Sequence, residues 1–167
     1  AFREDFVCNA TLSTGGCGLE QQLEAMYRAL VTHDARQRAG NTSPNAGFVR
    51  DNALLALVLV SDEEDGSVRD CRYAEAGVAC RDAISVYNAE SRDWGSADLN
   101  LRFYSYAPES TQDPTWPIDR YIDPTRPGRG FTSLKPGRPD MVIFSAIAGV
   151  PIELPAARNT AGDVSTD

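Results

Sequence analysis

A run of acidic residues directly after an apolar segment is the feature of this chain most able to do chemistry. Leu54–Val60 is entirely apolar, and the sequence DEED begins at Asp62 and ends at Asp65. Carboxylates at the end of a buried strand are partly desolvated, so they need hydrogen-bond donors or a cation. Mg²⁺ and Ca²⁺ prefer carboxylate oxygens. The cluster therefore indicates a hard-cation site, and a merely solvated acidic loop is the alternative.

A glycine-rich loop is the second candidate. Ser13–Gly18 reads STGGCG and precedes a predicted helix. It lacks the lysine of a phosphate-binding loop, and no hydrophobic strand directly precedes it. The amides at the start of a helix can still face an anion or support a metal-bound one. The structural alternative is a simple glycine turn, closed by a disulfide.

The cysteines fall into two local pairs. Cys8 and Cys17 are separated by the same interval as Cys71 and Cys80, and three pairings are possible in principle. We favour the two local disulfides, because each would close an irregular stretch, and they would indicate an oxidising compartment. Free thiols or a zinc site are the alternatives, but no Cys-x-x-Cys is present. His33, the only histidine, is expected on the surface.

Composition and motifs exclude several functions. Of 167 residues, 16 are basic and 24 acidic, which gives a net charge of −8. Such a balance argues against nucleic acid or an anionic membrane as the partner, because phosphate binding needs a basic face. No apolar run is long enough to span a bilayer. No Gly-x-Ser-x-Gly nucleophile motif occurs, and no complete catalytic set is visible.

The elements that must position these groups follow from hydrophobic periodicity. Leu19, Leu23, Met26 and Leu30 recur at helical spacing, which predicts an amphipathic helix from Gly18 to about residue 33. The continuous apolar runs 53–60 and 141–150 predict strands buried on both faces, and hence a mainly parallel sheet. We expect an α/β fold, a doubly wound sheet covered by helices on both faces.

The segment between the two strands is longer than a simple crossover needs. We expect a helix over residues 80–91 and a strand at LNLRFYSY, residues 99–106, where apolar and polar residues alternate. Residues 108–139 hold most of the prolines and should form an ordered but irregular excursion. Its basic residues, Arg120 and Lys135 among them, are expected near the periphery, in either a structural cover or a recognition surface.

Taken together, STGGCG before a helix and LVLVSDEED at a strand end resemble the von Willebrand factor type A (vWA) family. The segments GCGLEQQLEAMYRAL, NAGFVRDNALLALVLVSDEED and FSAIAGVP resemble vWA-like lipoproteins and surface proteins of myxobacteria and related Gram-negative bacteria. The resemblance implies a metal-ion-dependent adhesion site. Its Mg²⁺ or Ca²⁺ ligands would be Asp62 and Thr14, with Glu63 and Asp65 as weaker or supporting acids.

One part of the family pattern is missing. No Asp-x-Ser-x-Ser occurs before Thr14. We therefore expect residues 1–155 to be an N-terminally incomplete vWA-like domain with an insertion at about 67–138, followed by a polar tail or linker at 156–167. A degenerate site is the alternative.

The function implied by the resemblance is a non-enzymatic extracytoplasmic adhesion or protein-interaction domain. A divalent cation would bind an acidic side chain of a protein partner. The chain would be periplasmic, secreted or anchored to the outer membrane. The alternatives are a structural cell-envelope domain with a vestigial site and, less favoured, a metal-assisted hydrolase that uses the same acids.

Overall fold

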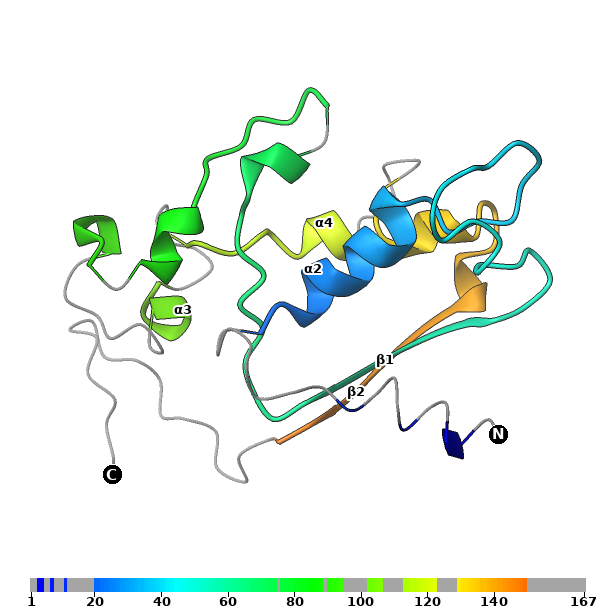
Figure 1. The fold of residues 1–167 in the computed structure, drawn as a ribbon, viewed down its shortest axis with the longest axis horizontal. Helices are drawn as coiled ribbons and strands as arrows, with labels where there is room; N and C mark the ends of the chain where they lie inside the picture. Colours follow the sequence, from blue (N-terminus) through cyan, green and yellow to red (C-terminus); the bar gives the residue numbers. More distant parts are fainter. Residues whose placement is uncertain are drawn as a thin grey trace.

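The computed structural model describes residues 3–4, 7, 11, 20–74, 76–88, 90–94, 102–106, 113–122 and 129–149. The fold is mixed α/β (Figure 1). Its strands are β1 (Leu55–Ser61) and β2 (Val142–Ala148), and its α-helices are α2 (Gln22–Tyr27), α3 (Arg102–Ser105) and α4 (Asp119–Ile122). Short 3₁₀ turns connect them. None of the helices in these ranges is long and apolar enough to cross a membrane.

The two predicted strands form and pair directly with each other. β1 and β2 are parallel, and their register runs from Leu55 opposite Val142 to Ser61 opposite Ala148. Both elements begin within two residues of their predicted starts. A parallel pair places both carboxyl ends at the same edge, so Ser61 and Ala148 end their strands side by side.

The predicted amphipathic helix is confirmed over most of its length. α2 continues without interruption into a π-helical turn, Arg28–Thr32. Tyr27 and Leu30 are buried and pack with Leu55 and Leu57 of β1 in the main hydrophobic core. Figure 1 shows α2 lying over one face of the strand pair. His33, just beyond the helical segment, is exposed as expected.

Burial on both faces of the strands, which the sequence predicts, is not seen among the described residues. Successive strand residues point to opposite faces, so Leu55 and Leu57 face α2 while Ala56 between them faces away. On that opposite face, Val58 is 52% exposed and Ile147 63% exposed. The apolar composition of both strands fits two covered faces, but within the described part of the chain only the α2 side of β1 is covered.

The predicted helix at 80–91 is wrong. Among the described residues of this range, a single 3₁₀ turn forms, Ile84–Tyr87, and a second follows at Arg92–Trp94. Local side-chain hydrogen bonds compete with the helix: Asp82 accepts the backbone N–H of Cys71 at 3.1 Å and that of Ile84 at 3.0 Å. The first bond ties the segment to the neighbouring loop, and the second occupies an amide that a helix would use.

The predicted strand at 99–106 is wrong where the structure describes it, because α3 occupies residues 102–105. Arg102 is buried, and its Nη1 donates to the carbonyl oxygens of Val86 at 2.7 Å and Asn88 at 2.8 Å. Phe103 packs in a second core with Val86 and Trp94. The alternation of polar and apolar residues suggested a strand, but the adjacent residues Arg102 and Phe103 are both buried on one helical turn.

Two of the basic residues expected at the periphery are buried. Arg120 of α4 is 8% exposed and Lys135 is 4% exposed. Lys135 Nζ donates to the carbonyl oxygen of Arg50, so it fastens the loop before β1. Residues 113–122 and 129–135 thus supply buried core groups, including Tyr121 and Phe131. This part of the excursion is a structural cover over α2.

Candidate functional site

The carboxyl end of β1 is fastened to the start of α2. Gln22 Nε2 of α2 donates to Ser61 Oγ, the last residue of the strand, at 2.6 Å. Ser61 Oγ also accepts the backbone N–H of Glu63 at 3.1 Å. These bonds fix the turn that follows the strand, and thereby the backbone that carries the side chains of Asp62 and Glu63.

Asp65 acts as the cap of α2 from outside the helix. Gln21 at the N-cap position makes no side-chain capping bond. Instead, Asp65 Oδ1 accepts the backbone N–H of Leu23 at 3.0 Å and the hydroxyl of Ser67 at 2.8 Å. Ser67 Oγ in turn accepts the N–H of Glu24 at 2.9 Å. The first-turn amides of Leu23 and Glu24 are therefore satisfied by the acidic loop, as a helix start requires.

The acids predicted as a metal site are divided between two roles. Asp62 and Glu63 are exposed, and their carboxylates form no hydrogen bond or ion pair with another described residue. The carboxylate of Asp65 is engaged in capping α2. Thr14 lies outside the described residues. Within the described ranges, no three His, Cys, Asp or Glu side chains gather so that they could hold a metal ion. The metal site stays a prediction.

A pocket of about 490 Å³, here called the strand-end pocket, lies beside this loop. Its walls include Asp65, Arg69, Asp113, Trp116 and Asp119. An antiparallel bridge between Val68 and Thr115 brings the two segments that line it together. The backbone N–H of Arg69 donates to the carbonyl of Pro114, and that of Trp116 to the carbonyl of Ser67, both at 2.9 Å. This pairing joins segments that are far apart in the sequence.

Two buried donors of this pocket lack acceptors. Arg69 Nε and Trp116 Nε1 are both buried and have no hydrogen-bond partner. Burial lowers the pKa of the Arg69 guanidinium from its usual value, and nearby Arg81 acts in the same direction, against the opposing effect of Asp113. A buried donor without a partner costs about 1–3 kcal/mol. Such groups call for an acceptor in the pocket, either water or a ligand.

A buried ion pair supports the wall formed by Trp116. Arg120 donates to both carboxylate oxygens of Glu24 at 3.0 Å, and Glu24 is 1% exposed. The Arg120 guanidinium lies 3.9 Å from the Trp116 ring centroid and 4.3 Å from that of Tyr27. The Tyr121 hydroxyl donates to Glu24 at 3.2 Å, and burial beside this carboxylate raises the Tyr121 pKa. The network holds Trp116 in one orientation.

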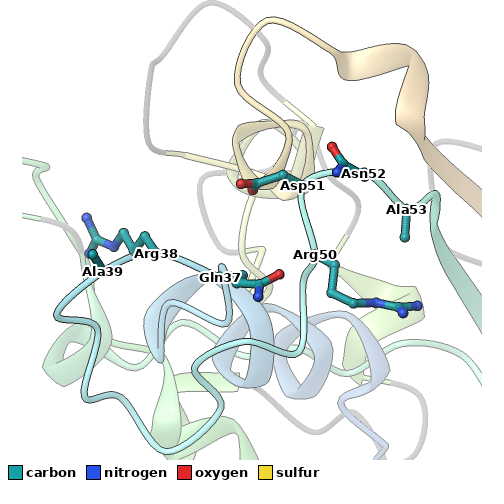
Figure 2. A pocket seen from close by; sticks show the side chains of 7 residues that line it. All are labelled: Gln37, Arg38, Ala39, Arg50, Asp51, Asn52 and Ala53. Carbon is teal, nitrogen blue, oxygen red and sulfur yellow. The ribbon is translucent and has the colours of Figure 1, made fainter.

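A second, more open pocket of about 810 Å³ lies between the loop after the π-helical turn and the loop before β1. Figure 2 shows the side chains of Arg38 and Arg50 directed to different sides of it. Arg38 is already paired with Asp34. Because the charged groups do not converge on one point, this pocket is a weaker candidate for specific binding.

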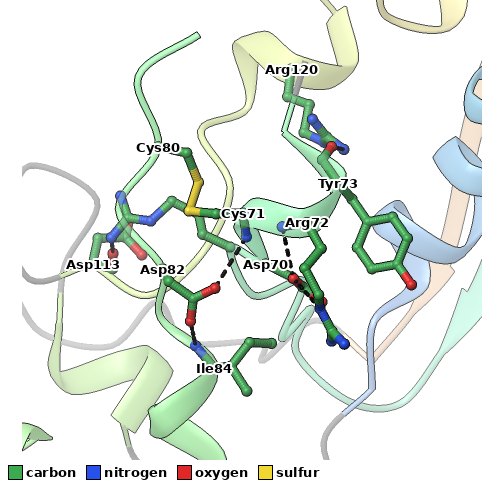
Figure 3. The surroundings of a disulfide bond; sticks show 10 residues. Asp70, Cys71, Arg72, Tyr73, Cys80, Asp82, Ile84, Asp113 and Arg120 are labelled. Carbon is green, nitrogen blue, oxygen red and sulfur yellow. Dashed lines mark hydrogen bonds and ion pairs between the residues drawn. A yellow bond between two sulfur atoms is a disulfide. The ribbon is translucent and has the colours of Figure 1, made fainter. Parts of the chain in front are cut away.

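The disulfide prediction is confirmed for one pair. Cys71 and Cys80 are bonded, with their Cα atoms 5.7 Å apart. Figure 3 shows the bond beside Asp82, whose carboxylate links Cys71 to Ile84, and beside the Asp70–Arg72 ion pair. The second predicted pair, Cys8 and Cys17, lies outside the described residues. The bonded pair closes the loop that follows Arg69, one of the residues that line the strand-end pocket.

Sequence reasoning identified the acidic loop but not Arg69 or the role of Trp116. Neither residue belongs to a local motif, and they meet only through the bridge between Val68 and Thr115. A signal was present in the tryptophan itself, because a tryptophan in a proline-rich polar segment commonly marks a packed or binding position.

Comparisons with known proteins add no relative: no protein-family model, no curated protein and no solved structure matches the chain. The resemblance to the vWA family therefore stays a prediction drawn from the quoted motifs.

Proposed function

We propose that this chain is a non-enzymatic, extracytoplasmic adhesion or protein-interaction domain of the vWA type. The observation that carries the proposal is the position of Asp62 and Glu63. Both are exposed carboxylates at the carboxyl end of a parallel strand pair, on a turn fixed by Ser61. Ligands of open α/β sheets gather at that end of the strands.

The proposed fold is a doubly wound sheet in which β1 and β2 are neighbouring strands. Parallel strands occur almost only in sheets with both faces covered, and an isolated pair is marginal. The uncovered face carries large apolar residues, such as Val58, Val60 and Ile147. We propose that this face is covered in the functional protein.

The compartment is proposed from the disulfide. Cys71 and Cys80 are bonded, and disulfides persist mainly in secreted, periplasmic and cell-surface proteins. An extracytoplasmic setting also suits an adhesion site, because extracellular modules bind Ca²⁺ weakly against a high ambient concentration.

The residues present fit a hard cation in part. Asp62 supplies one carboxylate without a described competitor, Glu63 lies next to it, and Asp65 is already used by α2. By resemblance, Thr14 would supply a hydroxyl. When bound, a divalent cation would offer an open coordination position to a carboxylate of a partner protein. This chain's contribution is to orient Asp62 at the strand end.

Calorimetric titration with MgCl₂ and CaCl₂ tests the proposal. The parent chain should bind at least one cation with a Kd of about 10⁻⁴–10⁻³ M. Asp62→Ala should abolish the heat, whereas Asp51→Ala, which removes an exposed carboxylate from the loop before β1, should leave it unchanged. Absence of binding in the parent chain, or equal binding in both variants, would refute the cation-dependent site.

A further inference from the structure

The strand-end pocket combines unsatisfied donors with unbalanced charge. Trp116 is 8% exposed, and its Nε1 has no partner, while Arg69 Nε is buried and unpaired in the same pocket. Both groups can only donate hydrogen bonds. An occupant must therefore present acceptor oxygens to this wall.

The other walls exclude a simple anion. Asp65, Asp113 and Asp119 line the pocket together with the single base Arg69. Asp65 caps α2, and Asp113 Oδ1 accepts the N–H and the hydroxyl of Thr115 at 2.8 and 2.7 Å. Asp119 is exposed and forms no hydrogen bond or ion pair with another described residue. With acids in excess, a free carboxylate or phosphate would be repelled, whereas a neutral carbonyl with a nearby cation is complementary.

We propose that the strand-end pocket binds a basic peptide segment. Its backbone carbonyl oxygens accept hydrogen bonds from Arg69 Nε and Trp116 Nε1, and its lysine or arginine side chain lies against Asp119. Ile118, which is 55% exposed at the rim, offers apolar surface to the aliphatic stem of that side chain. Arg69 Nη2 already donates to the carbonyl oxygen of Asp113, so Nε is the donor of this guanidinium that is left for the peptide.

Size and net charge favour this occupant over water alone. The volume of about 490 Å³ is far larger than the roughly 30 Å³ occupied by one water molecule, and it lies in the range of ligand sites. The net charge of −8 attracts basic segments over a distance and increases their rate of encounter. The inference does not depend on a cation at Asp62.

Nuclear magnetic resonance of the ¹⁵N-labelled chain in EDTA tests it directly. The chain has 2 tryptophans, so the indole region should hold one signal from each. Loss of one signal in Trp94→Phe or in Trp116→Phe assigns the pair, and either variant suffices. The probes are acetylated, amidated alanine peptides that carry one central lysine, alanine or glutamate.

The lysine peptide should move the Trp116 indole signal downfield, as a new hydrogen bond does, and bind about tenfold more tightly than the glutamate peptide. Asp119→Asn should weaken the lysine peptide about fivefold and leave the alanine peptide unchanged. Asp140→Asn, the matched control at the amino end of β2, should have no effect. Because EDTA is present, this result is independent of the cation titration.

Two results would overturn the proposal. The first is an indole signal of Trp116 that no peptide moves at about 5 mM, which would mean that water alone occupies the pocket. The second is equal binding of the glutamate and lysine peptides, which would remove the role of Asp119.

Discussion

Replacing Glu24 with glutamine is the most direct test of the buried layer beneath the strand-end pocket. Arg120 Nε and Nη2 donate to the two Glu24 oxygens, each at 3.0 Å. The Arg120 side chain is 4% exposed and the Glu24 side chain 2% exposed. Glu24→Gln keeps the shape of the side chain but removes the charge. Arg120 then remains buried without a full counter-charge.

The expected cost follows from what Arg120 retains. Breaking a buried ion pair by removing one partner costs about 3–5 kcal/mol. Glutamine still offers one acceptor oxygen, and Arg120 keeps the Tyr73 carbonyl at 3.1 Å and the aromatic faces of Tyr27 and Trp116. We therefore expect the lower end of the range, a loss of about 3 kcal/mol in the free energy of unfolding.

The reverse change should cost less. In Arg120→Met, the Glu24 carboxylate keeps Arg28 Nε at 3.2 Å and the Tyr121 hydroxyl at 3.2 Å. We expect a loss of about 2 kcal/mol. The double variant should be at least about 1.5 kcal/mol more stable than the sum of the two single losses predicts, because the pair is then removed together.

Urea unfolding followed by far-ultraviolet circular dichroism measures these free energies, provided that the m-values of the variants agree. Arg138→Met is the matched control. Arg138 pairs with Asp140 at 3.0 Å, but the two side chains are 63% and 65% exposed, so its loss should stay within about 0.5 kcal/mol. A Glu24→Gln variant as stable as this control would refute the buried pair.

Three further changes probe other parts of the structure. Replacing Cys71 and Cys80 together with serine should cost about 2–3 kcal/mol by freeing the unfolded loop, as measured by urea unfolding without reductant. Gly130→Ala should cost about 3 kcal/mol in the free energy of unfolding, because φ is +67° and the new Cβ would lie 2.7 Å from the Tyr121 carbonyl oxygen. Gly137→Ala has a φ of +74° but open space around the new Cβ, so it should cost only about 1 kcal/mol in the same assay. Hydrogen bonding from Arg72 lowers the Asp70 pKa, so its ionised form stabilises the fold above about pH 4, and the stability lost in Asp70→Asn should shrink as pH falls below that value in a pH series of melts.

Each of these has an opposing result. If the serine double variant is as stable as the parent, the disulfide does not constrain the unfolded chain. Equal losses at Gly130 and Gly137 would remove the close approach to Tyr121. A stability difference between Asp70→Asn and the parent chain that grows in acid would reverse the assigned direction of the Asp70 pKa shift.

Local patterns predicted the elements whose burial is one-sided or whose composition is extreme. The helical spacing of Leu23, Met26 and Leu30 predicted a helix where α2 and the π-helical turn after it form, because these side chains must reach the core together. The apolar runs predicted β1 and β2 and a mainly parallel sheet, and the two strands are parallel neighbours. One disulfide was predicted from spacing, since a short loop closes at low entropic cost.

The failures have a common physical cause in long-range or side-chain contacts. Residues 80–91 have helical composition, but the Asp82 carboxylate accepts the backbone N–H of Ile84 and that of Cys71, which lies outside this range. A pattern of polar and apolar residues places Arg102 on the outside, but its side chain is buried and donates to two carbonyl oxygens. Arg120 was placed at the periphery because its partner Glu24 lies far away in the sequence. No local window contains these pairs.

The acidic loop shows why its function could be predicted only in part. α2 has no capping side chain of its own, so Asp65 and Ser67 supply the acceptors for its first amides. The loop must therefore remain next to the helix start, and this requirement alone explains one of its acids. It does not explain Asp62 or Glu63, whose carboxylates point to solvent and contribute nothing to the cap. Since like charges held close together weaken a fold unless something offsets them, these two acids are where the proposed cation would bind.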